Sequence, residues 1–229
     1  MKYDIFLLDV DDTILDFHGA ALAAVQSAFE TCALEWKDGY AEEYTRFNAS
    51  LWAQLERKEI TREYLHATRF PQFLHLLGIE GADGDKINEL YEEFIMTRPK
   101  YFDGAKEFLE ILNEQGRVYF LTNGTQRIQR ARFDAADLWK YAKATFISGE
   151  AGADKPAKQY TDYVLARIPD FEKERAIWIG DSLTADIRAA VDAKIDCVWF
   201  NPQGKAGRED LIPTYEAKDY QKILQILGK

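Results

Sequence analysis

Four short polar motifs contain the side chains of this sequence that could do chemistry. Each follows an apolar run, directly or within a few residues, and the motifs are Asp9-Val10-Asp11-Asp12-Thr13, Thr122-Asn123-Gly124, Lys155-Pro156 and Gly180-Asp181-Ser182 with Asp186. Together they offer several carboxylates, a hydroxyl group and an ammonium group. Carboxylate oxygens suit Mg²⁺, and an ammonium group suits a phosphoryl oxygen. The motifs therefore suggest a site for a divalent metal and a phosphoryl group.

The apolar runs before these motifs predict the strands that must position them. The runs are rich in β-branched and aromatic residues and cover 5–8, 118–121, 145–147 and 176–179. Runs of this length and type suit the buried strands of a parallel sheet. In an open α/β sheet, ligands bind in the crevice outside the carboxyl ends of the strands. We therefore expect the four motifs to meet in one pocket.

The first motif supplies a candidate nucleophile. Asp9 ends the first predicted strand, and a carboxylate there can attack phosphorus to form an aspartyl-phosphate. Asp9 and Asp181 could provide oxygen ligands for Mg²⁺. The metal and Lys155 would then neutralise charge on the equatorial oxygens, which is the main contribution of a protein to phosphoryl transfer.

The remaining motif residues complete this chemistry. Asp11 could protonate the leaving-group oxygen and then activate water, and its backbone carbonyl could be a further metal ligand. Thr122 offers a hydroxyl group to a phosphoryl oxygen, and the turn at Asn123 offers backbone N–H groups for the same purpose. Asp186 could fix water on the metal or orient Lys155 without binding the metal itself.

Each motif also has a simpler structural interpretation. An isolated aspartate is more often a turn or helix-cap residue, and Thr122-Asn123-Gly124 alone is more often a turn. Lys155 alone would be a solvated surface charge, and Asp12 and Thr13 could be structural hydrogen-bonding residues. The catalytic interpretation is favoured because all four motifs occur in order, each near the end of its own strand.

From residue 118 onward the pattern alternates between strands and helices. This alternation predicts a parallel sheet with helices on both faces and right-handed crossovers. The expected strands are 117–121, 144–148, 176–179 and 195–200, and the expected helices are 105–115, 125–138, 157–167, 183–193 and 218–227.

Residues 17–98 contain no convincing strand. They show amphipathic helical patterns near 19–34, 40–57, 61–77 and 84–97, and Arg98-Pro99 ends the last of them. We therefore predict an α/β, Rossmann-like core formed by 1–16 and 99–229, with a helical domain inserted at 17–98. Such an insertion could act as a cap that admits substrate and then excludes water.

Composition narrows the class of protein and its partners. The 229 residues carry a formal charge of −10 without an evident basic patch, which argues against nucleic acid as a partner. No apolar run approaches the length of a membrane span, and no signal-peptide core follows the N-terminus. Cys32 and Cys197 have no metal-ligand spacing, which fits a reducing compartment. We expect a cytoplasmic monomer or small homo-oligomer.

With these motifs, the sequence resembles the haloacid dehalogenase-like (HAD) hydrolase superfamily. The four motifs match that superfamily's signature in order, and the helical insertion resembles its type I cap. The resemblance implies Mg²⁺ as cofactor, Asp9 as nucleophile and Asp11 as acid and base. It also implies phosphoryl contacts from Thr122 and Lys155, and metal ligands from Asp9, the Asp11 carbonyl and Asp181.

A closer similarity, to the YjjG-type bacterial 5′-nucleotidases, covers nearly the whole chain. It rests on Thr13-Ile14-Leu15-Asp16-Phe17, Leu51-Trp52, Glu59-Ile60-Thr61, Thr68-Arg69-Phe70, Gly180 through Ile187, and Trp199-Phe200-Asn201-Pro202. It implies hydrolysis of nucleoside monophosphates, pyrimidine or noncanonical. The sequence departs from the pattern in turns, at Asp103-Gly104, Ala157-Lys158 and Asp192-Ala193-Lys194.

Several alternatives remain open. A sugar-phosphate phosphatase or a phosphomutase would use the same motifs. A phospho-acceptor module or a non-catalytic binding protein is disfavoured by the large insertion and by the complete set of chemical groups. A dehalogenase would need no acid at Asp11. Substrate contacts could come from Phe17, His18, Trp52, Arg69, Phe70 and Tyr91, although aromatic residues at helical spacing are more often core.

Overall fold

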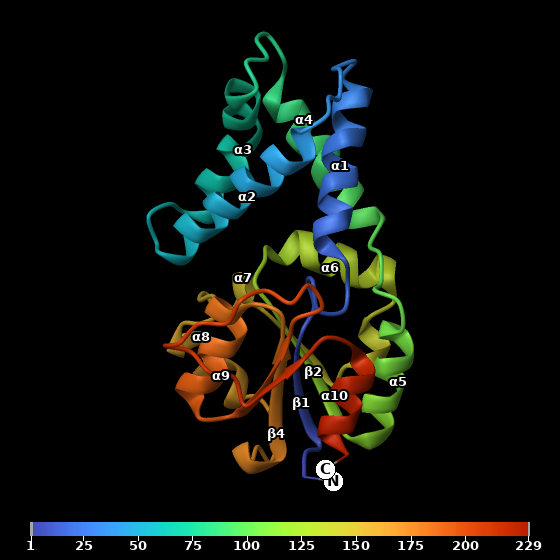
Figure 1. The fold of residues 1–229 in the computed structure, drawn as a ribbon, viewed down its shortest axis with the longest axis vertical. Helices are drawn as coiled ribbons and strands as arrows, with labels where there is room; N and C mark the ends of the chain where they lie inside the picture. Colours follow the sequence, from blue (N-terminus) through green and yellow to red (C-terminus); the bar gives the residue numbers. More distant parts are fainter. Residues whose placement is uncertain (1, 229) are drawn as a thin grey trace. The chain divides into compact units, whose positions relative to one another are not determined.

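The computed structural model describes residues 2–228, which form two compact units. The core unit contains residues 2–17 and 99–228, and the helical unit is His18–Arg98. Figure 1 shows the strands gathered in the core unit and the first four helices in the other. The division falls one residue from the predicted boundary at 16/17.

A six-stranded parallel sheet, in the order β3-β2-β1-β4-β5-β6, forms the centre of the core unit. The strands are β1 (Ile5–Asp9), β2 (Arg117–Thr122), β3 (Ala144–Ile147), β4 (Ala176–Gly180), β5 (Asp196–Phe200) and β6 (Tyr215–Ala217). β1 lies in the middle, and its Leu8 is in register with Phe120 of β2 and Ile179 of β4. The α/β parallel fold is confirmed, and β6 is an edge strand that the sequence did not predict.

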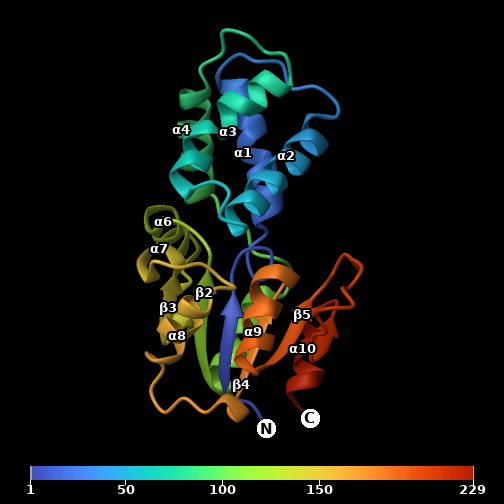
Figure 2. The same cartoon turned by 90° about the vertical axis from the view of Figure 1, so that its left-hand side faces the viewer.

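Alternate residues of each strand face two separate hydrophobic cores, because successive side chains of a strand point to opposite faces. Phe6 and Leu8 pack with α5 (Ala105–Gln115), α6 (Gln126–Ala136) and α10 (Tyr220–Leu227). Ile5 and Leu7 pack with α8 (Lys158–Leu165) and α9 (Arg188–Ala193) on the other face. The two helical layers on either side of the sheet are visible in Figures 1 and 2. Burial on both faces explains the nearly continuous apolar runs.

Two local features of the core unit differ from the predicted helices. The expected helix at 183–193 begins as a π-helical turn, Leu183–Ile187, before α9 continues it. A short helix, α7 (Ser148–Ala151), follows β3, where the sequence predicted none. Single π turns are frequent at functional sites, because the extra residue redirects neighbouring side chains.

The helices of the helical unit are α1 (Phe17–Thr31), whose first residue still belongs to the core unit, α2 (Tyr40–Glu56), α3 (Arg62–Leu76) and α4 (Gly84–Thr97). Their bounds are close to the predicted ranges. Thr61 and Asp83 cap α3 and α4 by accepting hydrogen bonds from Tyr64 N and Lys86 N. The core is aromatic, formed by Phe29, Tyr44, Phe70, Phe73 and Tyr91. Phe70 and Tyr91, which were considered as substrate contacts, are therefore core residues of this unit.

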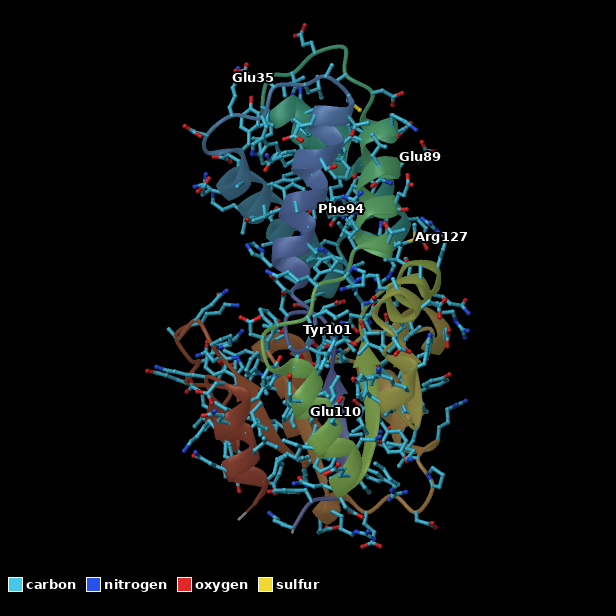
Figure 3. All side chains as sticks on the ribbon, turned by 90° about the vertical axis from the view of Figure 1, so that its right-hand side faces the viewer. Glu35, Glu89, Phe94, Tyr101, Glu110 and Arg127 are labelled. Atoms are coloured by element: carbon cyan, nitrogen blue, oxygen red, sulfur yellow. The ribbon has the colours of Figure 1, made fainter. Side chains whose placement is uncertain are left out.

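The negative charges of the chain lie largely at the surface. Glu35, Glu89 and Glu110, labelled in Figure 3, are exposed on their segments. Within residues 2–228, every helix is too short or too polar to span a bilayer.

Candidate active site

The predicted motifs lie at the carboxyl ends of neighbouring strands. Asp9 is the last residue of β1, Thr122 of β2 and Gly180 of β4, while Lys155 lies in the loop between α7 and α8. β1 lies in the middle of the sheet, with β2 and β3 on one side of it and β4, β5 and β6 on the other. In a doubly wound sheet the ligand-binding crevice lies where the strand order reverses, so it is expected at the carboxyl end of β1.

Lys155 connects the motifs from its loop. Its Nζ donates to Asp9 Oδ1 at 2.5 Å, to Asp186 Oδ1 at 2.7 Å and to the backbone carbonyl of Leu121 at 3.0 Å. Lys155 is 2% exposed, so these three acceptors replace water around its ammonium group. Burial by itself lowers the pKa of Lys155, but Asp186 and Asp9 outweigh it and hold that pKa above its ordinary value. The site therefore contains a permanent buried cation.

Three carboxylates lie close together here, and two of them, Asp9 and Asp186, accept hydrogen bonds from Lys155. Asp9, Asp181 and Asp186 each place an oxygen within 4.8 Å of the others. Burial, followed by repulsion from Asp186, raises the pKa of Asp9 to about 8. Burial and the charge of Asp9 raise the pKa of Asp181 well above its ordinary range. If all three carboxylates were ionised, they would therefore carry more negative charge than Lys155 neutralises.

A divalent cation would balance the negative charge of the three carboxylates. No side chain or backbone group of residues 2–228 donates a hydrogen bond to the Asp181 carboxylate, in contrast to Asp9 and Asp186, which bond Lys155. Oxygen ligands of this kind are those that Mg²⁺ prefers. Asp9 and Asp181 are the predicted side-chain ligands, and Asp186, predicted to act indirectly, lies close enough to be a third.

A glycine makes the position of Asp186 possible. A Cβ atom on Gly180 would lie 2.4 Å from Asp186 Cγ, far inside van der Waals contact. Asp186 Oδ2 also accepts from the backbone N–H of Ser182 at 3.2 Å, so the π turn bends Asp186 back toward the end of β4. Asp186 is 1% exposed and is therefore a fixed anion beside Lys155.

The loop after β1 places its side chains differently. Thr13 Oγ1 donates to Asp9 Oδ2 at 3.1 Å, which gives Thr13 the structural hydrogen bond considered from the sequence. Asp11 instead faces α6, where Gln129 Nε2 donates to its Oδ2 at 2.7 Å and Arg132 Nη2 lies 2.5 Å from its Oδ1. The Asp11 carboxylate is thus held by two groups that the motifs do not contain.

The second motif has two distinct roles in the structure. Thr122 is 1% exposed, and its Oγ1 accepts a hydrogen bond from Gln129 Nε2 at 2.6 Å. The Asn123 side chain bonds the backbone of Lys155 in both directions, donating to its carbonyl at 2.9 Å and accepting from its N–H at 2.8 Å. The amide of Asn123 is therefore used to fix the lysine loop, and the backbone N–H of Asn123 is the group that a phosphoryl oxygen could use.

Residues 3–194 match the family described as haloacid dehalogenase-like hydrolase. The chain belongs to this family. The predicted superfamily is thereby confirmed, and with it the class of enzyme that the motifs indicated, a HAD-type phosphatase.

Relatives of this HAD-like hydrolase cover it from end to end. YfnB of Bacillus subtilis, named as a HAD-hydrolase, is 36% identical over 227 residues, covering 99% of this chain and 96% of YfnB. The pyrimidine 5′-nucleotidase PynA of Streptococcus pneumoniae is 33% identical over 230 residues, covering 100% of this chain and 97% of PynA. A crystal structure of YfnB bound to magnesium superposes on this chain with a TM-score of 0.93 over 100% of both chains. That structure of YfnB reveals interdomain movement.

Gln129 and Arg132 of this HAD-like hydrolase were not predicted as site residues. They lie seven and ten residues after Thr122, on a helix whose other polar residues, such as Arg130, are exposed. The available signal was their spacing of three residues, which puts them on one face of a helix that begins directly after the second motif. The other predicted side chains, Asp9, Asp181, Asp186 and Lys155, lie together, and their individual roles remain predictions.

Proposed function

We propose that the chain is a Mg²⁺-dependent phosphomonoesterase that hydrolyses nucleoside 5′-monophosphates through an aspartyl-phosphate intermediate. The observation that carries the proposal is the contact of Lys155 Nζ with Asp9 Oδ1 at 2.5 Å, beside the carboxylates of Asp181 and Asp186. A carboxylate held beside a buried cation and further metal-ligating oxygens is suited to attack a phosphoryl group.

In the first step a carboxylate oxygen of Asp9 attacks phosphorus. The new O–P bond forms as the bond from phosphorus to the substrate's ester oxygen breaks, and protonated Asp11 gives its proton to that departing oxygen. Lys155 and the Thr122 hydroxyl stabilise the equatorial phosphoryl oxygens. The products of this step are the alcohol and phosphorylated Asp9.

In the second step water hydrolyses the intermediate. Asp11, now ionised, accepts a proton from the water molecule, whose oxygen attacks phosphorus. The bond between phosphorus and Asp9 breaks, so inorganic phosphate leaves and the Asp9 carboxylate is restored. Asp11 ends the cycle protonated, as it began.

Asp9, Asp181 and the Asp11 carbonyl would hold Mg²⁺, with Asp186 nearby. The bound metal supplies positive charge that neutralises the phosphoryl oxygens. The support in this chain is the excess of carboxylates over ammonium groups in the cluster, and the magnesium-bound structure of YfnB supports the same metal.

The substrate class rests on the relatives. PynA and YjjG of Escherichia coli, which is 25% identical over 229 residues, are both named pyrimidine 5′-nucleotidases. A sugar phosphate is the second candidate, because the ribulose-1,5-bisphosphate 5-phosphatase of Halopiger xanaduensis is 28% identical over 86% of this chain. Both substrates are small phosphate monoesters of an alcohol.

We further propose that the helical unit is the substrate-selecting cap. Its support is the insertion of residues 18–98 between the first strand and the rest of the core unit, together with the interdomain movement described for YfnB. Trp52 is its remaining aromatic candidate for substrate contact, because Arg69 is 2% exposed and donates to Asn88 Oδ1 within the helical unit. Phe17 and His18 lie at the junction of the two units.

Phosphate release measured with Mg²⁺ across a panel of nucleoside monophosphates and sugar phosphates tests the substrate class. We expect the highest kcat/KM for a pyrimidine or noncanonical nucleotide. Much faster turnover of a sugar phosphate than of every nucleotide would replace the first candidate by the second, and the mechanism would stand.

The covalent step is tested separately. Asp9→Asn should lose Mg²⁺-dependent phosphate release by a factor of about 10³ or more, because the amide is not a nucleophile. Acid quenching of the wild-type enzyme with phosphate-labelled substrate should leave label on the protein, and Asp9→Asn should carry none. Near-normal turnover by a folded Asp9→Asn protein would eliminate the mechanism.

A further inference from the structure

Two buried polar residues of α6 are not used by the mechanism above. Gln129 is 3% exposed and Arg132 is 2% exposed, although α6 otherwise presents much of its polar surface to solvent. A buried guanidinium group is costly unless its charge is paired. The carboxylate that pairs with Arg132 is Asp11, the proposed acid and base.

The contacts form a connected chain of four side chains. Arg132 Nη1 donates to Gln129 Oε1 at 2.7 Å, and Arg132 Nη2 lies 2.5 Å from Asp11 Oδ1. Gln129 Nε2 donates to Asp11 Oδ2 at 2.7 Å and to Thr122 Oγ1 at 2.6 Å. Gln129 and Arg132 thus face both oxygens of Asp11, one through a hydrogen bond and the other through an ion pair, and Thr122 Oγ1 is joined to the same network. These donors suit the ionised carboxylate that Asp11 becomes when it gives up its proton in the first step.

The chemistry of the groups fixes the direction of every bond. A guanidinium group can only donate, so the Gln129 oxygen must face Arg132. The Gln129 nitrogen then faces Asp11 and Thr122, and each of its two hydrogens has an acceptor. Because the Thr122 oxygen accepts from Gln129, the Thr122 hydroxyl hydrogen is left to donate elsewhere, as a phosphoryl oxygen requires.

Arg132 is supported on its other side by an aromatic ring. Its guanidinium lies 4.8 Å from the centre of the Phe17 ring, within the range of a cation–π contact. The stacked ring and the acceptor oxygen of Gln129 leave the guanidinium few alternative orientations. Phe17 and Gln129, which orient the Arg132 guanidinium, both belong to the core unit.

We infer that Arg132 and Gln129 are positioning residues that hold the Asp11 carboxylate and orient the Thr122 hydroxyl for catalysis. The inference rests on the proposed function, because it assigns their effect to the acid–base role of Asp11. Neither residue touches the reacting atoms, so the effect of Arg132 passes through Asp11, and the effect of Gln129 passes through Asp11 and Thr122.

Single-turnover cleavage by Arg132→Met, Asp11→Asn and the double variant tests this inference. Two substrates are compared, the best alkyl phosphate from the panel, whose leaving oxygen needs a proton, and p-nitrophenyl phosphate, whose leaving group needs none. For the alkyl phosphate we expect Arg132→Met to be about tenfold or more slower, within the ~10²–10⁴-fold that general acid–base catalysis contributes. For the aryl phosphate we expect a much smaller loss.

The double variant separates a positioning role from a merely structural one. If Arg132 acts through Asp11, then Arg132→Met should add little loss once Asp11 is Asn, as coupled residues in a mutant cycle do. The inference would be overturned if the rate losses of the two single variants multiply in the double variant. It would also be overturned if Arg132→Met slows the cleavage of both substrates equally. A normal rate for Arg132→Met beside a slow Asp11→Asn would overturn this inference alone, whereas a normal rate for Asp11→Asn would overturn the acid–base assignment itself.

Two further variants distinguish a specific effect of Arg132 from a folding defect. Arg130→Met, on the same helix, removes an arginine whose pairing with Glu150 is at the surface, and it should leave both rates unchanged. Arg132→Lys keeps the charge but has one nitrogen in place of Nη1 and Nη2. We expect its rate to lie between those of wild type and Arg132→Met, and a rate equal to wild type would contradict the two-point contact.

Discussion

At the scale of single residues, two glycines leave the space that the site residues occupy. A Cβ atom on Gly124 would lie 2.7 Å from Gln129 Cγ, and one on Gly180 would lie 2.4 Å from Asp186 Cγ. Neither glycine has a positive φ, so these positions require a missing side chain and not an unusual backbone conformation. The space left by the two glycines thus controls the positions of Asp186, beside the proposed metal ligands, and of Gln129, whose amide bonds Asp11.

Gly180→Ala should displace Asp186 and weaken its contact with Lys155. Inserting a methyl group into a packed site costs about 1–3 kcal/mol, so we expect a loss of this size in the free energy of unfolding. Mg²⁺ affinity should fall as well. Denaturant unfolding and a Mg²⁺ titration measure the two effects. Gly207→Ala is the matched control, because its Cβ would meet only Trp199 at the ordinary contact distance of 3.9 Å.

Gly124→Ala should act on Gln129 and not on the metal cluster. We expect kcat to fall in the same substrate-dependent way as in Arg132→Met, while the Mg²⁺ affinity stays near the wild-type value. The physical reason is that the new methyl group would move the amide that bonds Asp11 and Thr122. Unchanged kcat in a correctly folded Gly124→Ala protein would show that Gln129 can move without consequence.

The site residues were predictable from the sequence to the extent that they end strands. Asp9, Thr122 and Gly180 mark the points where apolar runs stop, so their types and positions together indicate a site. Gln129 and Arg132 could not be found in this way, because a polar residue within a helix is normally a solvated one. Only the three-dimensional contact with Asp11 separates them from their exposed neighbours.

At the scale of elements, α10 supports the loop that carries Asp11. The Tyr220 ring stacks on Phe108 and Phe200, with ring centres 4.7 and 5.2 Å apart, and its hydroxyl donates to the Thr13 carbonyl at 2.7 Å. α10 is thus bonded to the loop that follows β1. Tyr220 and Thr13 are far apart in the sequence but in direct contact in the structure.

Tyr220→Phe should keep the stacking and lose only this hydrogen bond. A buried carbonyl would then lack its partner, and we expect unfolding to become easier by about 0.5–1.5 kcal/mol. For a protein of this size that corresponds to a fall in Tm of roughly 1–6 °C. Tyr64→Phe is the control, since Tyr64 is 47% exposed and should change stability by less than about 0.5 kcal/mol. Equal effects of the two variants would contradict the supporting role of α10.

The elements that the sequence did not predict are those without a hydrophobic signal. β6 has only three residues and contains one strongly buried side chain, Ala217, so no apolar run marks it. The π turn at 183–187 has the composition of an ordinary helix start, and what selects it is the placement of Asp186 behind Gly180. Tertiary contacts, and not local propensity, decide both features.

At the scale of the whole molecule, the cluster of carboxylates makes stability depend on metal and pH together. The pKa of Asp9 rises from its ordinary value of 3.8 to about 8 in the metal-free fold. Between these values the folded protein binds more protons than the unfolded chain, so the stability of the metal-free protein falls as the pH rises from about 4 to 8. A metal that replaces those protons should reverse the loss.

We therefore expect Mg²⁺ to raise the Tm more at pH 8 than at pH 5. At a concentration of 100 times the Kd, binding adds about 2.7 kcal/mol, which corresponds to roughly 5–10 °C for a chain of this size. Asp181→Asn should remove most of this shift and should stabilise the metal-free protein at pH 8. Asp210→Asn, a surface carboxylate paired with Arg208, should retain it. A Tm that ignores Mg²⁺ at both pH values would contradict the metal site.

The position of β1 in the sheet has a consequence for how the chain reaches its native state. Its partners β2 and β4 pair with it across gaps of more than a hundred residues, as in Ile5 with Arg117 and with Ala176. During synthesis β1 therefore stays unpaired until the residues of β2 have been made, whereas the helices of 18–98 can form their local contacts before then. The strand that ends at Asp9 thus pairs later than the inserted helices form, and until then its apolar residues need protection from aggregation.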